Sequence, residues 1–213
     1  MPWKIMLVLT LGLLLAACTI ATGSGQTASE SRDVSGFTKI ELAGAGEVTV
    51  RQSGEESLTV EADTNLLPLV TSEVSNGTLV LGMKHNTIPL ATKTIRYHVK
   101  VRDLAGLSLS GSGDVAAADV RTATLRVEIS GSGRITASGS AEVQEVDISG
   151  SGSYQGADLA SKTARVHIAG SGSADLTVSE ALDARISGSG SVSYAGDPQI
   201  TQHITGSGKL TQK

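Results

Sequence analysis

From Phe37 onward, apolar and polar residues alternate, which is the pattern of β-strands with one buried face. Residues 64–70 (TNLLPLV) interrupt the alternation, and we expect a short helical turn around Pro68 there. Asn76-Gly77 is a strong turn signal, so a strand should start directly after it. The pattern thus predicts separate strands in the first half of the chain, at residues 37–42, 47–52, 57–62, 78–83 and 94–102.

In the second half, the alternation becomes part of a repeat. The tetrapeptide Ser-Gly-Ser-Gly, or a near-copy of it, starts at residues 110, 130, 149, 169, 187 and 205. Successive starts are 20, 19, 20, 18 and 18 residues apart. A period near 19 is typical of proteins built from stacked structural repeats.

Aligning the copies on the tetrapeptide shows what each position does. The residue before it is always aliphatic: Leu109, Ile129, Ile148, Ile168, Ile186 and Ile204. The residue before this aliphatic one, two positions before the tetrapeptide, is always polar: Ser108, Glu128, Asp147, His167, Arg185 and His203. Parallel strands stacked about 4.8 Å apart would place each aliphatic residue above the next one. The sequence therefore predicts an all-β, single-domain parallel β-solenoid (β-helix) with coils of about 19 residues.

Within this scheme, Ser-Gly-Ser-Gly is expected to form a corner between two strands of each coil. Its glycines fall on the inward side of the alternation and its serines on the outward side. Glycine lets the chain bend without a Cβ clash and accepts a positive φ. A phosphate-binding loop is disfavoured because no Gly-Lys-Ser/Thr follows and no helix pattern opens after the glycines.

Composition agrees with a thin-layered core. Hydrophobic residues make up 39% of the chain but aromatic residues only 2%, so the core must consist of Val, Ile, Leu and Ala. The net charge is −4 with both signs scattered along the chain. The absence of a basic run argues against nucleic acid as a partner.

The first residues read as an export signal. Lys4 precedes an apolar run of 11 residues, Ile5–Leu15, which is too short for a membrane-spanning helix. Leu15-Ala16-Ala17-Cys18 resembles the lipobox of bacterial lipoproteins, and Cys18 is the only cysteine in the chain. That resemblance implies a signal peptide at residues 1–17, acylation of Cys18 and a lipid anchor in the cell envelope. Because Thr19 follows the cysteine, the resemblance also implies the outer membrane where the source has two membranes.

Residues 18–34 are rich in Ser, Thr and Gly, and we expect them to be a flexible tether.

The folded part, residues 35–213, also resembles a known family. Four features occur in a distinctive order: a Phe-x-x-Ile start at Phe37, a small-residue turn at 43–46, an Asn-Leu-Leu segment at Asn65 and a Gly-Thr-Leu strand at Gly77. This order resembles that of the putative auto-transporter adhesin, head GIN domain family. The resemblance implies a right-handed β-helix-like solenoid in a bacterial envelope protein and carries over no catalytic residues. We expect less regular coils and a cap at 35–104 and regular repeats at 105–213.

The sequence offers little catalytic chemistry. Its four histidines lack metal-ligand spacing, and nothing indicates a cofactor, a metal or a catalytic residue. We therefore expect a non-catalytic, adhesin-like or structural module that meets an envelope glycan or protein, or another copy of itself through the solenoid ends. The alternative is a polysaccharide-active lyase or glycosidase, because such enzymes also use β-helices. Candidate recognition residues are those of the variable outward column: Glu128, Asp147, His167, Arg185 and His203.

Overall fold

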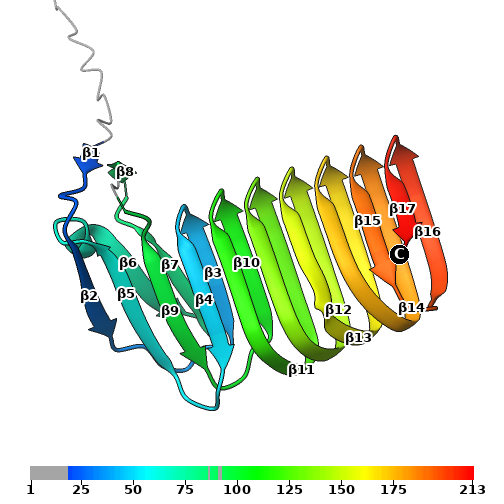
Figure 1. The fold of residues 1–213 in the computed structure, drawn as a ribbon, viewed down its shortest axis with the longest axis horizontal. Helices are drawn as coiled ribbons and strands as arrows, with labels where there is room; N and C mark the ends of the chain where they lie inside the picture. The colour runs from blue at the N-terminus through cyan, green and yellow to red at the C-terminus, as the bar shows by residue number, and fades with distance from the viewer. Residues whose placement is uncertain (1–18, 86, 91–92) are drawn as a thin grey trace, which may run out of the picture.

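The repeats form long, bent strands that stack side by side along one axis (Figure 1). The computed structural model describes residues 19–85, 87–90 and 93–213, so the predicted signal peptide and Cys18 lie outside the described residues. Each coil runs along one face of the solenoid, bends, and returns along the other face to the next corner. The strands of this half are β10 (Gly106–Gly111), β11 (Asp114–Gly131), β12 (Arg134–Gly150), β13 (Ser153–Gly170), β14 (Ser173–Gly188), β15 (Ser191–Ala195), β16 (Gln199–Gly206) and β17 (Lys209–Gln212).

The aliphatic columns stack as the sequence predicts. Ile129 pairs with Ile148 in the next coil, and Ile148 pairs with Ile168, all within parallel strands. These three side chains are buried, whereas the residues directly before them, Glu128, Asp147 and His167, are exposed. Alternate residues from both faces form one hydrophobic cluster that runs along the whole solenoid. The predicted fold, an all-β parallel solenoid in a single domain, is confirmed.

The Ser-Gly-Ser-Gly corner depends on both of its glycines, since a Cβ at Gly131 or at Gly133 would lie 2.4 Å from a carbonyl oxygen of the preceding coil. Gly131 has a φ of +130°, which strongly favours glycine, and it is only half-buried. Gly133 is buried, and a Cβ at this position would lie 2.4 Å from the carbonyl oxygen of Gly113 in the preceding coil. The prediction that the glycines face inward is thus correct for the second glycine and wrong for the first.

The opposite bend contains a buried polar cluster that breaks the aliphatic pattern. The parallel register shifts there, for example between Thr136 and Gly139. The hydroxyl of Tyr154 donates a hydrogen bond to Oε1 of Gln144 (2.8 Å), and Nε2 of Gln144 donates to Oγ of Ser161 (2.8 Å) and to the carbonyl of Leu159 (3.1 Å). Burial raises the pKa of the Tyr154 hydroxyl above its ordinary value, so the phenol stays a donor. Every polar atom of the Gln144 amide group thereby has a partner, which is what a buried amide requires.

The N-terminal half begins with antiparallel strands and changes to parallel coils. β3 pairs with β7 and β10 in parallel, and β4 does so with β9 and β11. At the far end, β5 pairs antiparallel with β9 and β6 antiparallel with β7. The expected helical turn around Pro68 is present as a short 3₁₀ turn, η1. The elements of this half are β1 (Thr19–Thr22), β2 (Thr27–Arg32), β3 (Lys39–Gly44), β4 (Glu47–Gln52), β5 (Ser57–Asp63), η1 (Leu67–Leu69), β6 (Val70–Ser75), β7 (Thr78–Met83), β8 (Thr87–Leu90) and β9 (Arg96–Val101).

The flexible tether predicted for residues 18–34 is wrong for most of the part that the structure describes. β2 pairs antiparallel with β5 over all six of its residues, and β1 pairs in parallel with β8. Arg32 further fastens β2, because its guanidinium donates hydrogen bonds to the carbonyls of Val70 and Leu67, both 3.0 Å away. These partners lie more than thirty residues away in the sequence, so local composition does not reveal them. None of the described segments forms an apolar helix of membrane-spanning length.

Candidate functional site

The candidate recognition column lies on the outward side of β11 to β14 and of β16, in the half of each coil that leads to the next corner. The parallel register pairs Glu128 with Asp147, Asp147 with His167, His167 with Arg185 and Arg185 with His203. All five side chains are exposed, and they form one row that crosses five coils. The structure therefore brings together the residues that the repeat alignment singled out.

A second charged row, which sequence reasoning missed, lies beside the first. Its members occur two residues earlier in each coil and share the same outward face: Arg126, Glu145, Arg165 and Asp183. The signal was present in the alternation, because residues two apart on a strand point to the same side. We call the two rows together the charged face.

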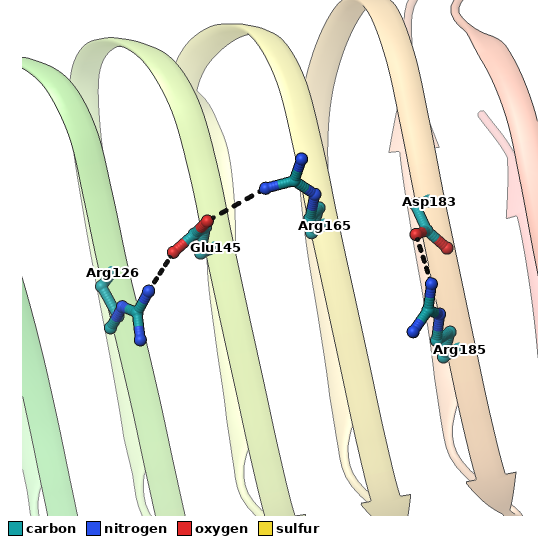
Figure 2. A network of polar contacts seen from close by, with 5 residues as sticks. All are labelled: Arg126, Glu145, Arg165, Asp183 and Arg185. Carbon is teal, nitrogen blue, oxygen red and sulfur yellow. Dashed lines mark hydrogen bonds and ion pairs between the residues drawn. The ribbon is translucent and has the colours of Figure 1, made fainter.

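The second row is held together by shared ion pairs (Figure 2). Glu145 lies between two arginines: Oε2 is paired with Nη2 of Arg126, and Oε1 lies 3.2 Å from Nη1 of Arg165. Within the next coil, Nη2 of Arg185 lies 3.0 Å from Oδ2 of Asp183. The Glu145 side chain is only 22% exposed, whereas that of Arg165 is 70% exposed. The carboxylate is thus covered by its partners, while the guanidinium group of Arg165 faces solvent.

These ion pairs contribute little to folding. Exposed salt bridges typically stabilise a protein by about 0–1 kcal/mol each. Each guanidinium group has five N–H donors, and the pairs described above use only a few of them. The unused donors are available to carboxylates or other anionic groups of a partner.

The first row is less constrained. Within the described residues, the side chains of Asp147 and His167 make no hydrogen bond or ion pair, although they are register neighbours. An open depression of about 560 Å³ lies at the two rows. It is lined by Arg126, Glu145, Asp147, Arg165, His167, Asp183 and Arg185, together with Val146 and Val166. The charged face therefore combines anchored arginines with uncommitted groups around a shallow hollow.

The arrangement fits binding better than catalysis. Glycoside hydrolysis typically needs two carboxylates across a cleft, one of which donates a proton. Here Glu145 is ion-paired with two arginines and Asp183 with one, and both lie along an open row of charges rather than across a cleft. Among the described residues, no group of three or more His, Cys, Asp and Glu side chains could hold a metal ion.

Aromatic side chains are also missing from the described surface. Phe37, Tyr97, Tyr154 and Tyr194 are all buried in the core. Stacking on an exposed ring is therefore not available to a ligand on this part of the chain. Recognition on the charged face must rely on ionic contacts and hydrogen bonds.

Comparison with known proteins identifies a family and several similar folds. A family model described as "Putative auto-transporter adhesin, head GIN domain" matches residues 36–198. Among solved structures, a putative adhesin from Bacteroides fragilis superposes with a TM-score of 0.74 at 22% identity, covering 90% of this chain and 99% of that one. A putative lipid binding protein from Parabacteroides distasonis gives a TM-score of 0.62 at 23% identity, covering 92% of this chain and 100% of that one. No curated protein matches the chain. At these identities, the solved structures are similar in fold alone.

Proposed function

The chain belongs to the putative auto-transporter adhesin, head GIN domain family. From this membership we propose that it is a non-catalytic, lipid-anchored protein of the bacterial cell envelope. We further propose that it binds a partner through its charged face. The partner carries carboxylate groups, as an acidic envelope glycan or an acidic protein segment does. The anchor is Cys18, and the protein is exported, to the outer membrane where the source has two membranes.

One observation carries the binding role: the concentration of charged groups on one side of an otherwise repetitive solenoid. On the opposite side, the corresponding outward column of β11 to β15 carries one charged pair, Asp114 and Arg134, followed by serine in the next three coils, at Ser153, Ser173 and Ser191. Because exposed ion pairs add little stability, folding does not require seven ionisable residues around one depression. Arginine forks match carboxylates in geometry as well as charge, which favours an acidic partner.

The binding proposal is tested by immobilising the protein and measuring its affinity for acidic and neutral envelope polysaccharides and for acidic peptides. Exchanging Arg165 and Arg185 together for Gln should weaken binding of the acidic ligand at least tenfold. Exchanging Arg51 and Arg134 together for Gln is the matched control, because each is a similarly exposed arginine with one ion pair, to Asp119 and Asp114, on the opposite side. Its effect should stay below twofold. Equal losses for the two variants would show that net charge, rather than the charged face, governs binding.

The same ligands test the enzymatic alternative. Incubation of acidic polysaccharides with the protein, followed by assays for new reducing ends and unsaturated products, should show no turnover. Reproducible product release would overturn the non-catalytic proposal.

The anchor is tested separately by metabolic labelling with a clickable fatty acid in a lipoprotein-processing bacterium. The wild-type chain should incorporate the label and Cys18→Ala should not. Equal labelling of both chains would refute acylation at Cys18.

A further inference from the structure

A small two-stranded ribbon lies apart from the solenoid sheet. β1 and β8 pair in parallel and form a sheet of their own, which joins no other strand. In Figure 1 the ribbon projects at the upper left, at the N-terminal end of the solenoid. Hydrogen bonds hold it to the body: Nδ2 of Asn65 donates to the carbonyl of Thr22 (2.8 Å), and the amide of Ser24 donates to Oδ1 of Asn65 (2.9 Å).

The ribbon exposes apolar side chains. Ile20 is 63% exposed and Leu90 is 54% exposed, the two highest values among the large hydrophobic residues that the structure describes. Ile20 pairs in register with Ile88, and Thr22 pairs with Leu90. Because paired residues and residues two apart share a side of a sheet, Ile20 and Leu90 lie on the same face of the ribbon. Two large aliphatic groups on one small face are more than the scattered single exposures usual on a protein surface.

The segments that build the ribbon contain no acidic residue. No Asp or Glu occurs before Glu30, and none occurs between Glu73 and Asp103. The exposed Lys84 and Lys93 precede and follow β8. The nearby acid Asp63 is fully buried and accepts hydrogen bonds from backbone amides, including that of Gly25 at 2.9 Å. The ribbon itself therefore carries no acidic side chain that would repel anionic lipid headgroups.

The position of the ribbon in the chain identifies what it faces. β1 starts at Thr19, so the predicted acylated residue, Cys18, precedes the strand directly. Consecutive Cα atoms are about 3.8 Å apart, which leaves no slack between the acyl chains and the folded ribbon. Once the acyl chains enter a bilayer, the headgroup region must lie next to β1.

From this juxtaposition we propose that the apolar face of the β1–β8 ribbon, with Ile20 and Leu90 at its centre, contacts the lipid bilayer beside the anchored Cys18. The proposal rests on the lipid anchor proposed above and adds a second membrane contact to it. Acyl chains alone hold a protein at a membrane without orienting it, whereas a rigid apolar face next to them turns the N-terminal end of the solenoid toward the lipid. The charged face then extends away from that end.

Site-specific photocrosslinking in the full-length, processed chain tests this contact. A diazirine amino acid replaces Ile20 or Leu90 and, as matched controls, Val74 or Ile200, which are 38% and 43% exposed elsewhere on the surface. Membranes are irradiated, and lipid adducts are quantified by mass spectrometry of the labelled peptide. We expect at least fivefold more lipid adduct at positions 20 and 90 than at positions 74 and 200.

The mass of the N-terminal peptide from the same samples reports acylation, which separates the two proposals. Acylated protein with equal lipid adducts at all four positions would overturn the ribbon contact and leave the anchor standing. Adducts to protein at position 20 would likewise overturn it, in favour of a protein partner. Absence of acylation would overturn both proposals, because the position of Cys18 is the premise of this one.

Discussion

Gly133→Ala should destabilise the solenoid by about 3 kcal/mol, although the substitution adds a single methyl group. The new Cβ would lie 2.4 Å from the carbonyl oxygen of Gly113 and 2.4 Å from Cδ2 of Leu109. Real Cβ atoms do not approach other atoms so closely, and the nearest atom is backbone of the preceding coil. Adjacent coils must therefore move apart at this corner.

The magnitude follows from what that movement disturbs. Overpacking of a tightly packed site typically costs about 1–3 kcal/mol. The corner also contains three hydrogen bonds between coils: the amides of Ser132 (3.0 Å) and Gly133 (3.1 Å) donate to the Gly111 carbonyl, and the Arg134 amide donates to the Gly113 carbonyl (3.0 Å). Lengthening them would cost up to about 1 kcal/mol each. Restricting the unfolded chain offsets roughly 0.4–1 kcal/mol of the total.

Gly106→Ala is the matched control. Gly106 is also buried and also lacks a positive φ, but a Cβ there meets first the side chain of Lys39, at 3.3 Å from Cγ. Because a lysine side chain can shift, we expect the stability to change by less than about 1 kcal/mol. Guanidinium unfolding followed by far-UV circular dichroism measures both variants. The reasoning fails if Gly133→Ala unfolds at the wild-type midpoint, or if Gly106→Ala loses as much stability.

Three further predictions concern the interior and the charged face. Tyr154→Phe leaves Oε1 of Gln144 without its donor, so the free energy of unfolding measured with a chemical denaturant should fall by about 1–3 kcal/mol. The hydroxyl of Tyr194 has no protein partner within the described residues, so Tyr194→Phe should change that free energy by less than about 0.5 kcal/mol. Burial raises the pKa of Tyr97 to about 12, so the folded state favours the neutral phenol; stability is complete below about pH 10 and falls as the pH rises toward 12. Tyr97→Phe should reduce that loss, and an unchanged pH profile of unfolding midpoints would contradict the assignment. Glu145→Gln should lower the free energy of unfolding by less than about 1 kcal/mol at low salt and by almost nothing in 1 M salt. A large, salt-independent loss would show that the ion pairs with Arg126 and Arg165 stabilise the folded state.

The regular half of the molecule was predictable because its determinants are local and repeated. Ile129 and Ile148 occupy the same position in successive copies, so aligning the copies already gives the register. The need for glycine at the corner followed from the same alignment. The atoms that exclude a side chain did not, since Gly131 and Gly133 both lie against the backbone of another coil.

The irregular half was less predictable because its contacts join distant segments. Residues 27–32 have the composition of a linker, yet they form a strand whose backbone partners belong to β5. A short, Ser-rich strand without an apolar face gives no periodic signal, and only the edge offered by β5 makes it a strand.

The candidate site was half visible in the sequence. The alignment identified the column with Asp147 and His167 because that column varies while its neighbours do not. It did not reveal that Glu145 joins Arg126 to Arg165, since an ion pair depends on side-chain geometry across coils rather than on spacing within one coil. The depression at the two rows likewise exists only once the coils are stacked.

The sequence by itself determined the coil, its period, the inward aliphatic columns and the face on which charged residues gather, because alternation within a strand and repetition between strands are properties of order along the chain. The tertiary structure alone decided which end is closed by antiparallel strands, which charges are paired, and that a ribbon with exposed Ile20 and Leu90 starts directly after Cys18. Those features depend on backbone and side-chain groups meeting across long sequence separations, where the balance of hydrogen bonding, burial and charge is set by three-dimensional proximity.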